Sequence, residues 1–434
     1  MLNTRYVLEH IEEIRKSLEK RKSDYPIDEL LQLDEKSKGM HKQIQELREK
    51  RNKGSREIAD LTKSGEKVDR ERIEELGKVR ESIDQLENDV VKYDSRIESL
   101  LWNMPNILHE SVPYGVGDEG NVEIRKVGMP MKRAEPRHNE VLEKLDMLNL
   151  EQAAKVAGAR FYYLKGDLVL LEQSLIRFAI DTLVAKGYTA LSPPFMLKRE
   201  YYRHVTALGD FEEALYVAGE AKEAEQGKDL EKIEDELFLI STSEHPTAAL
   251  HADTVFSVNE LPKKYVAVSP CFRREAGSHG KDTKGIFRVH QFYKVEQFVI
   301  TREEDSWKMH EELLSNAEEI FNKLNIPYRV VNICTGDIGI VAAKKYDLEA
   351  YMPAQDTYRE MVSCSNCTDW QSLRLGMRYD EGKERKYAHT LNCTALATTR
   401  AIVAIIENYL NDDGTVTIPD VLVPYMNGKS KLGR

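Results

Sequence analysis

The chain has 434 residues, a length at which domains of roughly 100 to 200 residues make two or more folded units the default expectation. Charged residues make up 32% of it, against roughly 25% in typical globular domains, so some element must be extended and solvated. The formal net charge of -11 argues against non-specific nucleic-acid binding by the whole surface, but it is compatible with a local basic patch.

The sequence shows no sign of membrane insertion, secretion or disulfide bonding, which indicates a cytoplasmic protein. No stretch approaches the roughly 20 apolar residues of a transmembrane helix, and the first five residues lead into a charged helical pattern rather than a signal-peptide core. Five cysteines, an odd number spread over a long chain, do not suggest a disulfide framework. We therefore expect a reducing compartment and no membrane partner.

Residues 28–100 carry two series of positions at alternating steps of three and four, the a and d spacing of a heptad repeat. The first, mainly apolar, is Leu30, Leu33, Ser37, Met40, Ile44, Leu47, Arg51, Gly54, Ile58 and Leu61. The second, apolar throughout, is Leu76, Val79, Ile83, Leu86, Val90, Tyr93, Ile97 and Leu100. A Ser-Gly turn signal separates them, so two antiparallel helices should form a coiled-coil arm of roughly 50 Å.

The far end of this arm is locally basic. Residues 48–80 contain eleven Lys or Arg against eight Asp or Glu. The polar or small positions Ser37, Arg51 and Gly54 predict a seam that loosens toward the turn. Because charge runs are usually solvated faces, the arm alone favours a spacer or oligomerisation coil, with nucleic-acid contact as the alternative.

The stretch after Leu101 is rich in Pro and Gly and predicts a linker. Beyond residue 150, helical patterns at 168–186, 303–324 and 398–410 alternate irregularly with β-rich runs at 264–268, 288–300 and 328–332. The runs 287–293 and 295–300 are predicted to be the two strands of a hairpin. We expect an α+β domain with a central antiparallel sheet flanked by helices.

Neither usual Gly-rich phosphate cradle is present, because the chain has no G-x-x-x-x-G-K-[ST] and no G-x-G-x-x-G after a strand. Bound ATP would therefore be held by side chains. Cys364 and Cys367 have C-x-x-C spacing, but no second pair or nearby His completes four ligands. We expect no zinc there, and a metal or redox role for the two thiols is the alternative.

Three segments of the large domain carry specific strings. Residues 187–194 end in Ser-Pro-Pro, with Pro194 last; residues 272–292 begin Phe-Arg-Arg-Glu; residues 389–400 begin His-Thr-Leu-Asn and end in Arg400. They resemble motifs 1, 2 and 3 of class II aminoacyl-tRNA synthetases, and in detail those of the seryl-tRNA synthetase family. Further family-like stretches at 104–113, 242–244, 294–297 and 360–366 extend the resemblance over nearly the whole chain.

The resemblance implies activation of serine by ATP, in which a carboxylate attacks the α-phosphorus, so the site must hold two anions together. It places Arg273 as the catalytic fork that bridges the serine carboxylate and the α-phosphate. It places Phe292 and Arg400 on the two adenine faces, and Glu360 and Ser363 as ligands of ATP-bound Mg²⁺. The implied ATP-binding residues are Arg273, Arg274, Glu275, Arg288, Val289, Phe292, Glu360, Met361, Val362, Ser363 and Arg400.

For serine, the resemblance implies Thr242, Ser243, Glu244, Arg273, Glu296, Asn392 and Thr394. The resemblance places Glu296 as the catalytic-site carboxylate that would accept the serine hydroxyl, with Thr394 beside it. Alanine would leave that acceptor unpaired and be rejected. Glu244 would meet the ammonium group, and a structural salt bridge is the plainer alternative for both carboxylates.

The resemblance also implies a tRNA-binding helical domain at 1–110, a catalytic domain at 111–434 and a homodimer that charges tRNA(Ser), with tRNA(Sec) as a further substrate where present. Motif 3 departs from the usual Gly-rich form, as in archaeal and eukaryotic members, and the acidic segment 219–236 has no assigned role. One alternative is a paralogue that loads a carrier protein, which the intact arm disfavours. The other is a degenerate synthetase that only binds, which the joint presence of Arg273, Glu275, Glu296, Glu360 and Arg400 disfavours.

Overall fold

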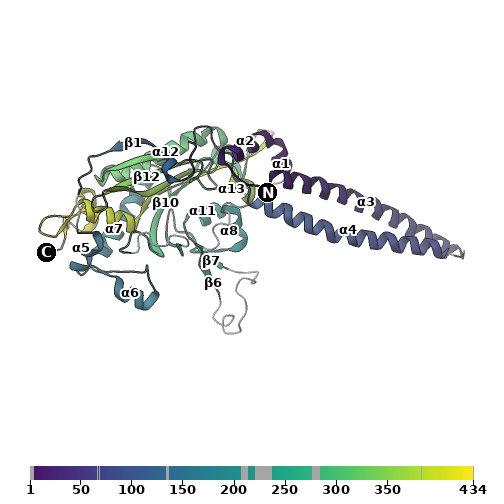
Figure 1. Ribbon diagram of the computed structural model, residues 1–434, viewed down its shortest axis with the longest axis horizontal. Helices are drawn as coiled ribbons and strands as arrows, with labels where there is room; N and C mark the ends of the chain where they lie inside the picture. The colour runs from purple at the N-terminus through teal and green to yellow at the C-terminus, as the bar shows by residue number, and fades with distance from the viewer. Residues whose placement is uncertain are drawn as a thin grey trace. The chain divides into compact units, whose positions relative to one another are not determined.

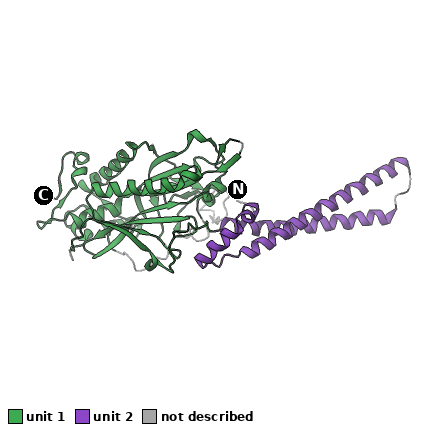
Figure 2. Cartoon of the chain, turned by 90° about the horizontal axis from the view of Figure 1, so that it is seen from above, with its two compact units in different colours: residues 1, 105–434 green, residues 2–104 purple. Residues whose placement is uncertain are grey.

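The computed structural model describes residues 4–65, 67, 69–132, 136–206, 214–219, 237–275, 284–382 and 384–433. The chain divides into two compact units, an arm unit of residues 2–104 and a large unit of residues 105–434, coloured separately in Figure 2. The division falls slightly before the predicted boundary at residue 110. Among the described residues, no helix combines the length and apolarity needed to cross a membrane.

The arm unit consists of helices α1 (Thr4–Glu9), α2 (Ile11–Arg21), α3 (Ile27–Ser64) and α4 (Arg70–Trp102). The long helices α3 and α4 lie side by side along their whole length (Figure 1). Gly65 ends α3 in the left-handed conformation, with φ 76°, that favours glycine. Every position of both heptad series is buried or half-buried, and from Leu47 to the turn all those of α3 are only half-buried, so the predicted coiled coil is confirmed.

Polar contacts set the pairing of the two long helices. The expectation that Ser37 weakens the seam is wrong, because its hydroxyl is buried and donates to Asp94 Oδ1 at 2.6 Å. Nearer the turn, an ideal Cβ on Gly54 would lie 2.8 Å from a methyl of Leu76, so that position suits only a small residue. Exposed ion pairs across the arm, such as Arg48 with Glu87 at 2.7 Å, add little stability.

The large unit is built on an eight-stranded sheet of order β1-β11-β12-β13-β16-β10-β9-β4, antiparallel except for β4 beside β9. Its strands are β1 (Val122–Val127), β4 (Thr189–Leu191), β9 (Lys263–Phe272), β10 (Gln291–Thr301), β11 (Tyr328–Asn332), β12 (Lys344–Met352), β13 (Thr357–Asn366) and β16 (His389–Ala397). Helices α7 (Asp167–Val184), α12 (Ser306–Lys323) and α14 (Thr398–Asn408) share the main apolar core with it. The predicted α+β fold with a helix-flanked antiparallel sheet is confirmed.

Alternation along the strands separates the two faces of this sheet. On β10, Val295 and Val299 enter the core that contains the three helices, while Phe298 and Ile300 enter a second, smaller cluster. The helices therefore cover one face, and the second cluster lies on the opposite face.

The large unit also contains the shorter helices α5 (His138–Lys144), α6 (Leu150–Ala157), α8 (Arg199–Val205), α11 (Glu244–Ala249) and α13 (Trp370–Leu375), and four small sheets. Two of these sheets have two strands: β2 (Leu148–Asn149) with β3 (Tyr163–Leu164), and β17 (Val416–Thr417) with β18 (Lys431–Leu432). The other two have three strands. In one, β7 (Leu237–Leu239) lies between β5 (Met196–Lys198) and β6 (Val217–Ala218); in the other, β14 (Arg378–Glu381) lies between β8 (Val255–Ser257) and β15 (Glu384–Tyr387).

Two sequence predictions about this unit are wrong. The runs 287–293 and 295–300 are not the two arms of a hairpin, because residues 291–301 form one continuous strand whose partner is β9, starting at Gln291 opposite Phe272. The stretch after Leu101 is no free linker either. The backbone N–H groups of Asn106 and His109 donate to Ile340 and Ala343, and Thr335 donates to the carbonyl of Pro113.

Candidate active site

A cavity of about 450 Å³ opens in the large unit on the face of the sheet away from α7, α12 and α14. Eleven of the predicted site residues line it: Thr242, Glu244, Arg273, Phe292, Glu296, Glu360, Met361, Ser363, Asn392, Thr394 and Arg400. They come from segments that are far apart in the sequence, so it is the sheet that brings them together.

Strand β10 supplies one side of the cavity through simple alternation. Phe292, Lys294 and Glu296 are two residues apart and all line the cavity, whereas Val295 between them lies in the core with the helices. Arg273 follows the end of the paired strand β9, where its Nε donates to the carbonyl of Ser241 at 3.3 Å and its guanidinium lies 5.4 Å from the centre of the Phe292 ring. Arg273 is thereby aimed into the cavity beside the aromatic ring.

A bulge in β16 changes which residues reach the cavity. Val295 pairs with Leu396 and Glu296 with Thr394, so Ala395 is an extra residue without a partner on β10. Asn392 and Thr394 line the cavity before the bulge and Ala397 lines it after the bulge. Glu296 and Thr394 are therefore direct neighbours across the two strands.

A second bulge lies in β13. Leu348 of β12 pairs with Val362, while the next residue, Glu349, pairs with Glu360, which leaves Met361 as the extra residue. Both Glu360 and Met361 reach the cavity for this reason, together with Ser363 and Ser365 further along the strand.

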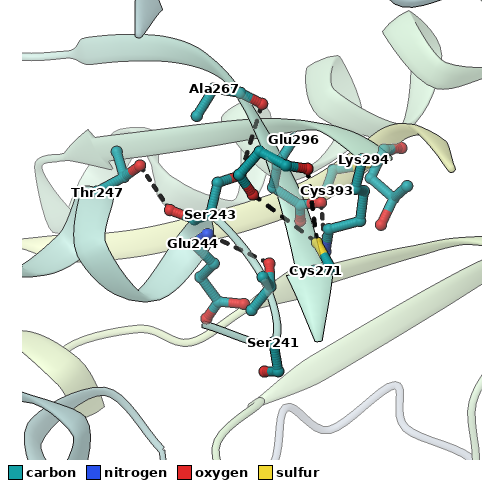
Figure 3. Close-up of polar contacts among 12 residues, drawn as sticks. Ser241, Ser243, Glu244, Thr247, Ala267, Cys271, Lys294, Glu296 and Cys393 are labelled. Carbon is teal, nitrogen blue, oxygen red and sulfur yellow. Dashed lines mark hydrogen bonds and ion pairs between the residues drawn. The ribbon is translucent and has the colours of Figure 1, made fainter. Parts of the chain in front are cut away.

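The floor of the cavity holds a buried ion pair. Lys294 Nζ lies 2.7 Å from Glu296 Oε2, with side chains only 8% and 2% exposed (Figure 3). Apart from this ion pair, the buried Oε2 makes no hydrogen bond of good geometry among the described residues, so the carboxylate retains unused acceptor capacity.

A second carboxylate, Glu244, shares this floor. Its Oε1 accepts from Gln371 Nε2 at 2.8 Å, and Gln371 Oε1 accepts in turn from Thr390. Burial and then repulsion from Glu296 raise the pKa of Glu244 to about 7, although Lys294 opposes the shift. Nearby, burial lowers the pKa of His245 to about 3, so this imidazole is neutral.

The other end of the cavity is rich in cations. Arg400, in the first turn of α14, donates through Nη1 to the carbonyl of Glu360 at 2.8 Å and lies 3.2 Å from its Oε1. Burial acts to raise the pKa of Glu360, but Arg400, Lys345 and Arg273 outweigh it and hold this pKa at about 2. The Glu360 side chain remains 47% exposed, so its second oxygen can meet a ligand.

Lys345 joins this end from β12, where its Nζ lies 3.3 Å from Oδ2 of the buried Asp347. Burial raises the pKa of Asp347 to about 7, while Lys345 lowers it. Both ends of the cavity therefore carry charges of both signs: two carboxylates beside Lys294 at one end, and two cations beside Glu360 at the other.

Six predicted residues do not line the cavity. Val289 and Val362 lie in the main core, and Ser243 is fully buried, with its carbonyl accepting from Thr247 at 2.6 Å. Arg288 and Glu275 pair with each other at 3.3 Å, and the backbone N–H of Arg274 donates to the carbonyl of Ala214. Residues 276–283 of the predicted motif 2 loop and residues 220–236 of the acidic segment lie outside the described residues.

The cavity also has a lining that the sequence did not reveal. Lys294 and Lys345 are part of it, and the irregular segment 338–342 forms one wall. The signal for Lys294 was available, since it is two residues before Glu296 on a strand. No periodicity marks residues 338–342, because they belong to neither a helix nor a strand.

The C-x-x-C cysteines have different surroundings. Cys364 lies in the main core, where His310 Nε2 contacts its carbonyl at 3.0 Å, whereas Cys367 lines the cavity and its Sγ accepts from Asn392 Nδ2 at 3.5 Å. Within the described part of the chain, no three His, Cys, Asp or Glu side chains group as metal ligands.

Two family matches cover different parts of the chain. Residues 1–108 match the family described as the seryl-tRNA synthetase N-terminal domain. Residues 228–409 match the tRNA synthetase class II core domain (G, H, P, S and T). The first match ends close to the division between the two units, and the second contains all the predicted site residues.

Individual relatives extend these matches to the full length. The serine–tRNA ligase of Thermococcus sibiricus is 48% identical over 431 residues, which cover 94% of this chain and 91% of the relative. The crystal structure of seryl-tRNA synthetase from Pyrococcus horikoshii complexed with ATP is similar with a TM-score of 0.86 and 44% identity, covering 100% of this chain and 99% of that one. The cytoplasmic serine–tRNA ligase of Naegleria fowleri in complex with AMP gives a TM-score of 0.81 and 37% identity, covering 97% and 95%. The chain belongs to the seryl-tRNA synthetase family.

Proposed function

We propose that the cavity activates L-serine with ATP and that the chain then transfers the seryl group to the 3′ end of tRNA(Ser). In the first step a serine carboxylate oxygen bonds to the α-phosphorus and the bond to the β-phosphate oxygen breaks, releasing pyrophosphate with that electron pair. In the second step a terminal ribose hydroxyl of the tRNA attacks the seryl carbonyl carbon, and AMP leaves.

The observation that carries this proposal is the position of Glu296 at the cavity floor. Its carboxylate is almost fully buried, has Lys294 at 2.7 Å and has Thr394 as its cross-strand neighbour. A buried acceptor of this kind binds a small substrate that brings a hydroxyl group, and it leaves alanine with an unpaired polar partner. Glu244 and Thr242 take the ammonium group, while Asn392 completes the serine pocket and Ser243 supports it from the buried turn.

Arg273 is the catalytic residue that bridges the substrate carboxylate and the α-phosphate. Its planar, permanently charged fork suits two anions, and its place between Phe292 and the cavity floor supports this role. Phe292 stacks on the adenine, with Arg400 on the other face and near the γ-phosphate. Glu275, Arg288 and Val289 lie next to the motif 2 segment that would enclose the nucleotide, with Arg274, Met361 and Val362 as flanking backbone.

Mg²⁺ fits this site. Glu360 and Ser363 present hard oxygen donors into the same cavity, and only one Glu360 oxygen is engaged by Arg400. Magnesium held there with ATP would supply positive charge to the phosphate oxygens.

The arm unit and motif 1 support the proposed partners, which are a tRNA and a second copy of the chain. Together with the family, the basic far end of the coiled coil supports contact with tRNA(Ser), and with tRNA(Sec) where the organism has one. A homodimer is supported by Pro194 and the exposed apolar residues Phe195 and Met196, which directly follow the edge strand β4. The five free cysteines are consistent with a cytoplasmic, reducing location.

Two linked assays test the function. Serine-dependent exchange of labelled pyrophosphate into ATP measures activation, and transfer of labelled serine to tRNA measures charging. We expect both, with alanine and threonine as amino-acid controls for the first. Exchange without transfer to any tRNA would instead favour a carrier-protein paralogue, and the absence of both reactions would favour a protein that only binds.

A further inference from the structure

One wall of the cavity has no regular secondary structure of its own. Residues 338–342 lie between β11 and β12 and belong to neither a helix nor a strand, yet all five line the cavity. Their backbone groups take part in no strand ladder, so other parts of the chain must hold the wall in place.

Asn106 makes two hydrogen bonds to this wall. Its backbone N–H donates to the carbonyl of Ile340 at 2.7 Å, and its Nδ2 donates to the carbonyl of Val341 at 2.8 Å. The same Nδ2 lies 2.8 Å from the carbonyl of Cys367 and 3.0 Å from Thr368 Oγ1. The side chain is only 6% exposed and therefore ties the wall to the end of β13 in a buried setting.

The segment after Asn106 supports the same wall from behind. Val112 packs with Ile338 and Ala342 in a small core separate from the main one, and the N–H of His109 donates to the carbonyl of Ala343 at 3.0 Å. This small core is apolar and carries no directional contact to Cys367. Where the wall meets β12, the Ala343 N–H donates to the Asn366 carbonyl at 2.8 Å, and the Asn106 amide adds the contact that joins the middle of the wall to Cys367.

The contact to Cys367 connects Asn106 with the serine end of the cavity. Cys367 lines the cavity, and its Sγ accepts from Asn392 Nδ2 at 3.5 Å. Asn392 lies two residues before Thr394 on β16, and both line the cavity with Glu296, the cross-strand neighbour of Thr394. A shift of the wall against Cys367 would change the serine pocket before it changes the phosphate end.

We propose that Asn106 is a positioning residue for serine activation: it contacts no substrate, but its amide fixes the 338–342 wall against Cys367 and so sets the shape of the serine pocket. This inference rests on the proposed function. An asparagine suits the position because the same side chain donates to Val341 and Cys367 while its Oδ1 accepts from the N–H of Ile107 at 2.8 Å.

The test compares Asn106→Ala and Asn106→Asp with a matched control, Asn408→Ala, in the full-length chain. Asn408 Nδ2 also joins two backbone carbonyls, those of Tyr351 and Ala404, but Asn408 does not line the cavity. Asn106→Asp keeps the shape of the side chain but replaces the donating Nδ2 by an oxygen, which would face the carbonyl oxygens of Val341 and Cys367. Pyrophosphate exchange is measured over ranges of serine and of ATP, together with thermal unfolding.

We expect both Asn106 variants to raise the KM for serine at least tenfold and the KM for ATP less than threefold, with the Asn408 variant within twofold of the parent chain for both. A serine KM within twofold of the parent in a folded Asn106 variant would overturn the proposal, as would an equal rise in both KM values.

If the Asn106 variants lose cooperative unfolding, Thr368→Val tests the proposal instead, because it removes one hydrogen-bond partner of the Asn106 amide and keeps the shape of the Thr368 side chain. A serine KM raised about threefold would support the proposal, and an unchanged one would overturn it. An inactive parent chain would refute the proposed function instead.

Discussion

Lys294 and Glu296 form an ion pair of 2.7 Å on neighbouring inward positions of one strand, and both side chains are almost fully buried. Desolvating both charges is costly, and a pair of this kind often stabilises a fold no better than apolar residues would. Its position under the cavity suggests a different benefit. Lys294 holds the Glu296 carboxylate in one orientation, so that an acceptor for a hydroxyl group is in place before the substrate arrives.

Lys294→Met should remove the cation while keeping the length of the side chain. Breaking a buried pair leaves an uncompensated charge at a cost of about 3 to 5 kcal/mol, so we expect serine-dependent pyrophosphate exchange to fall by roughly a hundredfold or more in kcat/KM. Steady-state exchange kinetics at pH 7.5 measure this. Lys264→Met is the control, because Lys264 of the neighbouring strand β9 pairs with Glu312 of α12 at 2.8 Å and does not line the cavity. Equal losses in the two variants would assign Lys294 a purely structural role.

Glu296→Ala should destroy the discrimination between serine and alanine. A site built to hydrogen-bond a hydroxyl rejects an analogue without it by roughly 10⁴-fold, and that selectivity depends on the buried acceptor. The ratio of kcat/KM for serine to that for alanine in the exchange assay should therefore drop toward one, or activation should cease. Selectivity equal to that of the parent chain, with normal serine activation, would remove Glu296 from its assigned role.

The KM for serine should depend on pH through Glu244. Burial, with repulsion from Glu296, raises the pKa of Glu244 to about 7, so this carboxyl is charged above pH 7 and takes up a proton below it. Only the charged form attracts the substrate ammonium group, so the KM should rise as the pH falls through 7, by up to about tenfold per pH unit in the limit of strong coupling. Exchange kinetics between pH 5.5 and 8.5 measure this. Glu244→Gln should give a high KM with little dependence on pH in that range, and a flat profile in the parent chain would contradict the assignment.

The sequence predicted the parts of the molecule whose patterns are regular. The heptad positions from Leu30 to Leu100 became the seam of the coiled coil, and even Ser37 fits there, because Asp94 on the facing helix satisfies its hydroxyl. That partner lies 57 residues away, and no local rule identifies it. The hairpin around 287–300 was placed wrongly because a continuous strand and two short ones have the same alternation of apolar residues.

The cavity was predictable only where the family resemblance supplied the residues. The bulges at Met361 and Ala395 reverse the alternation on two strands, so a simple two-residue period does not predict that Glu360 and Ala397 face the cavity. Asn106 and the wall at 338–342 are more than 200 residues apart, and their contact arises from hydrogen bonds between irregular segments. Only a three-dimensional structure reveals contacts of that kind.

Shortening the arm should separate the two steps of the reaction. Deleting residues 51–78 and joining the ends by two glycines cuts α3 and α4 at facing positions, since Gly54 of one helix faces Leu76 of the other. The deletion also removes eight of the eleven Lys and Arg residues of the stretch 48–80. Because these residues belong to a different compact unit from the cavity, pyrophosphate exchange should stay within about twofold of the parent chain. Transfer of serine to tRNA should fall by a hundredfold or more in kcat/KM, as expected when several phosphate contacts are lost together.

The pyrophosphate-exchange kinetics of the shortened chain serve as the internal control for folding. Unchanged charging kinetics in the shortened chain would mean that the arm is a spacer, which is what its own sequence favours.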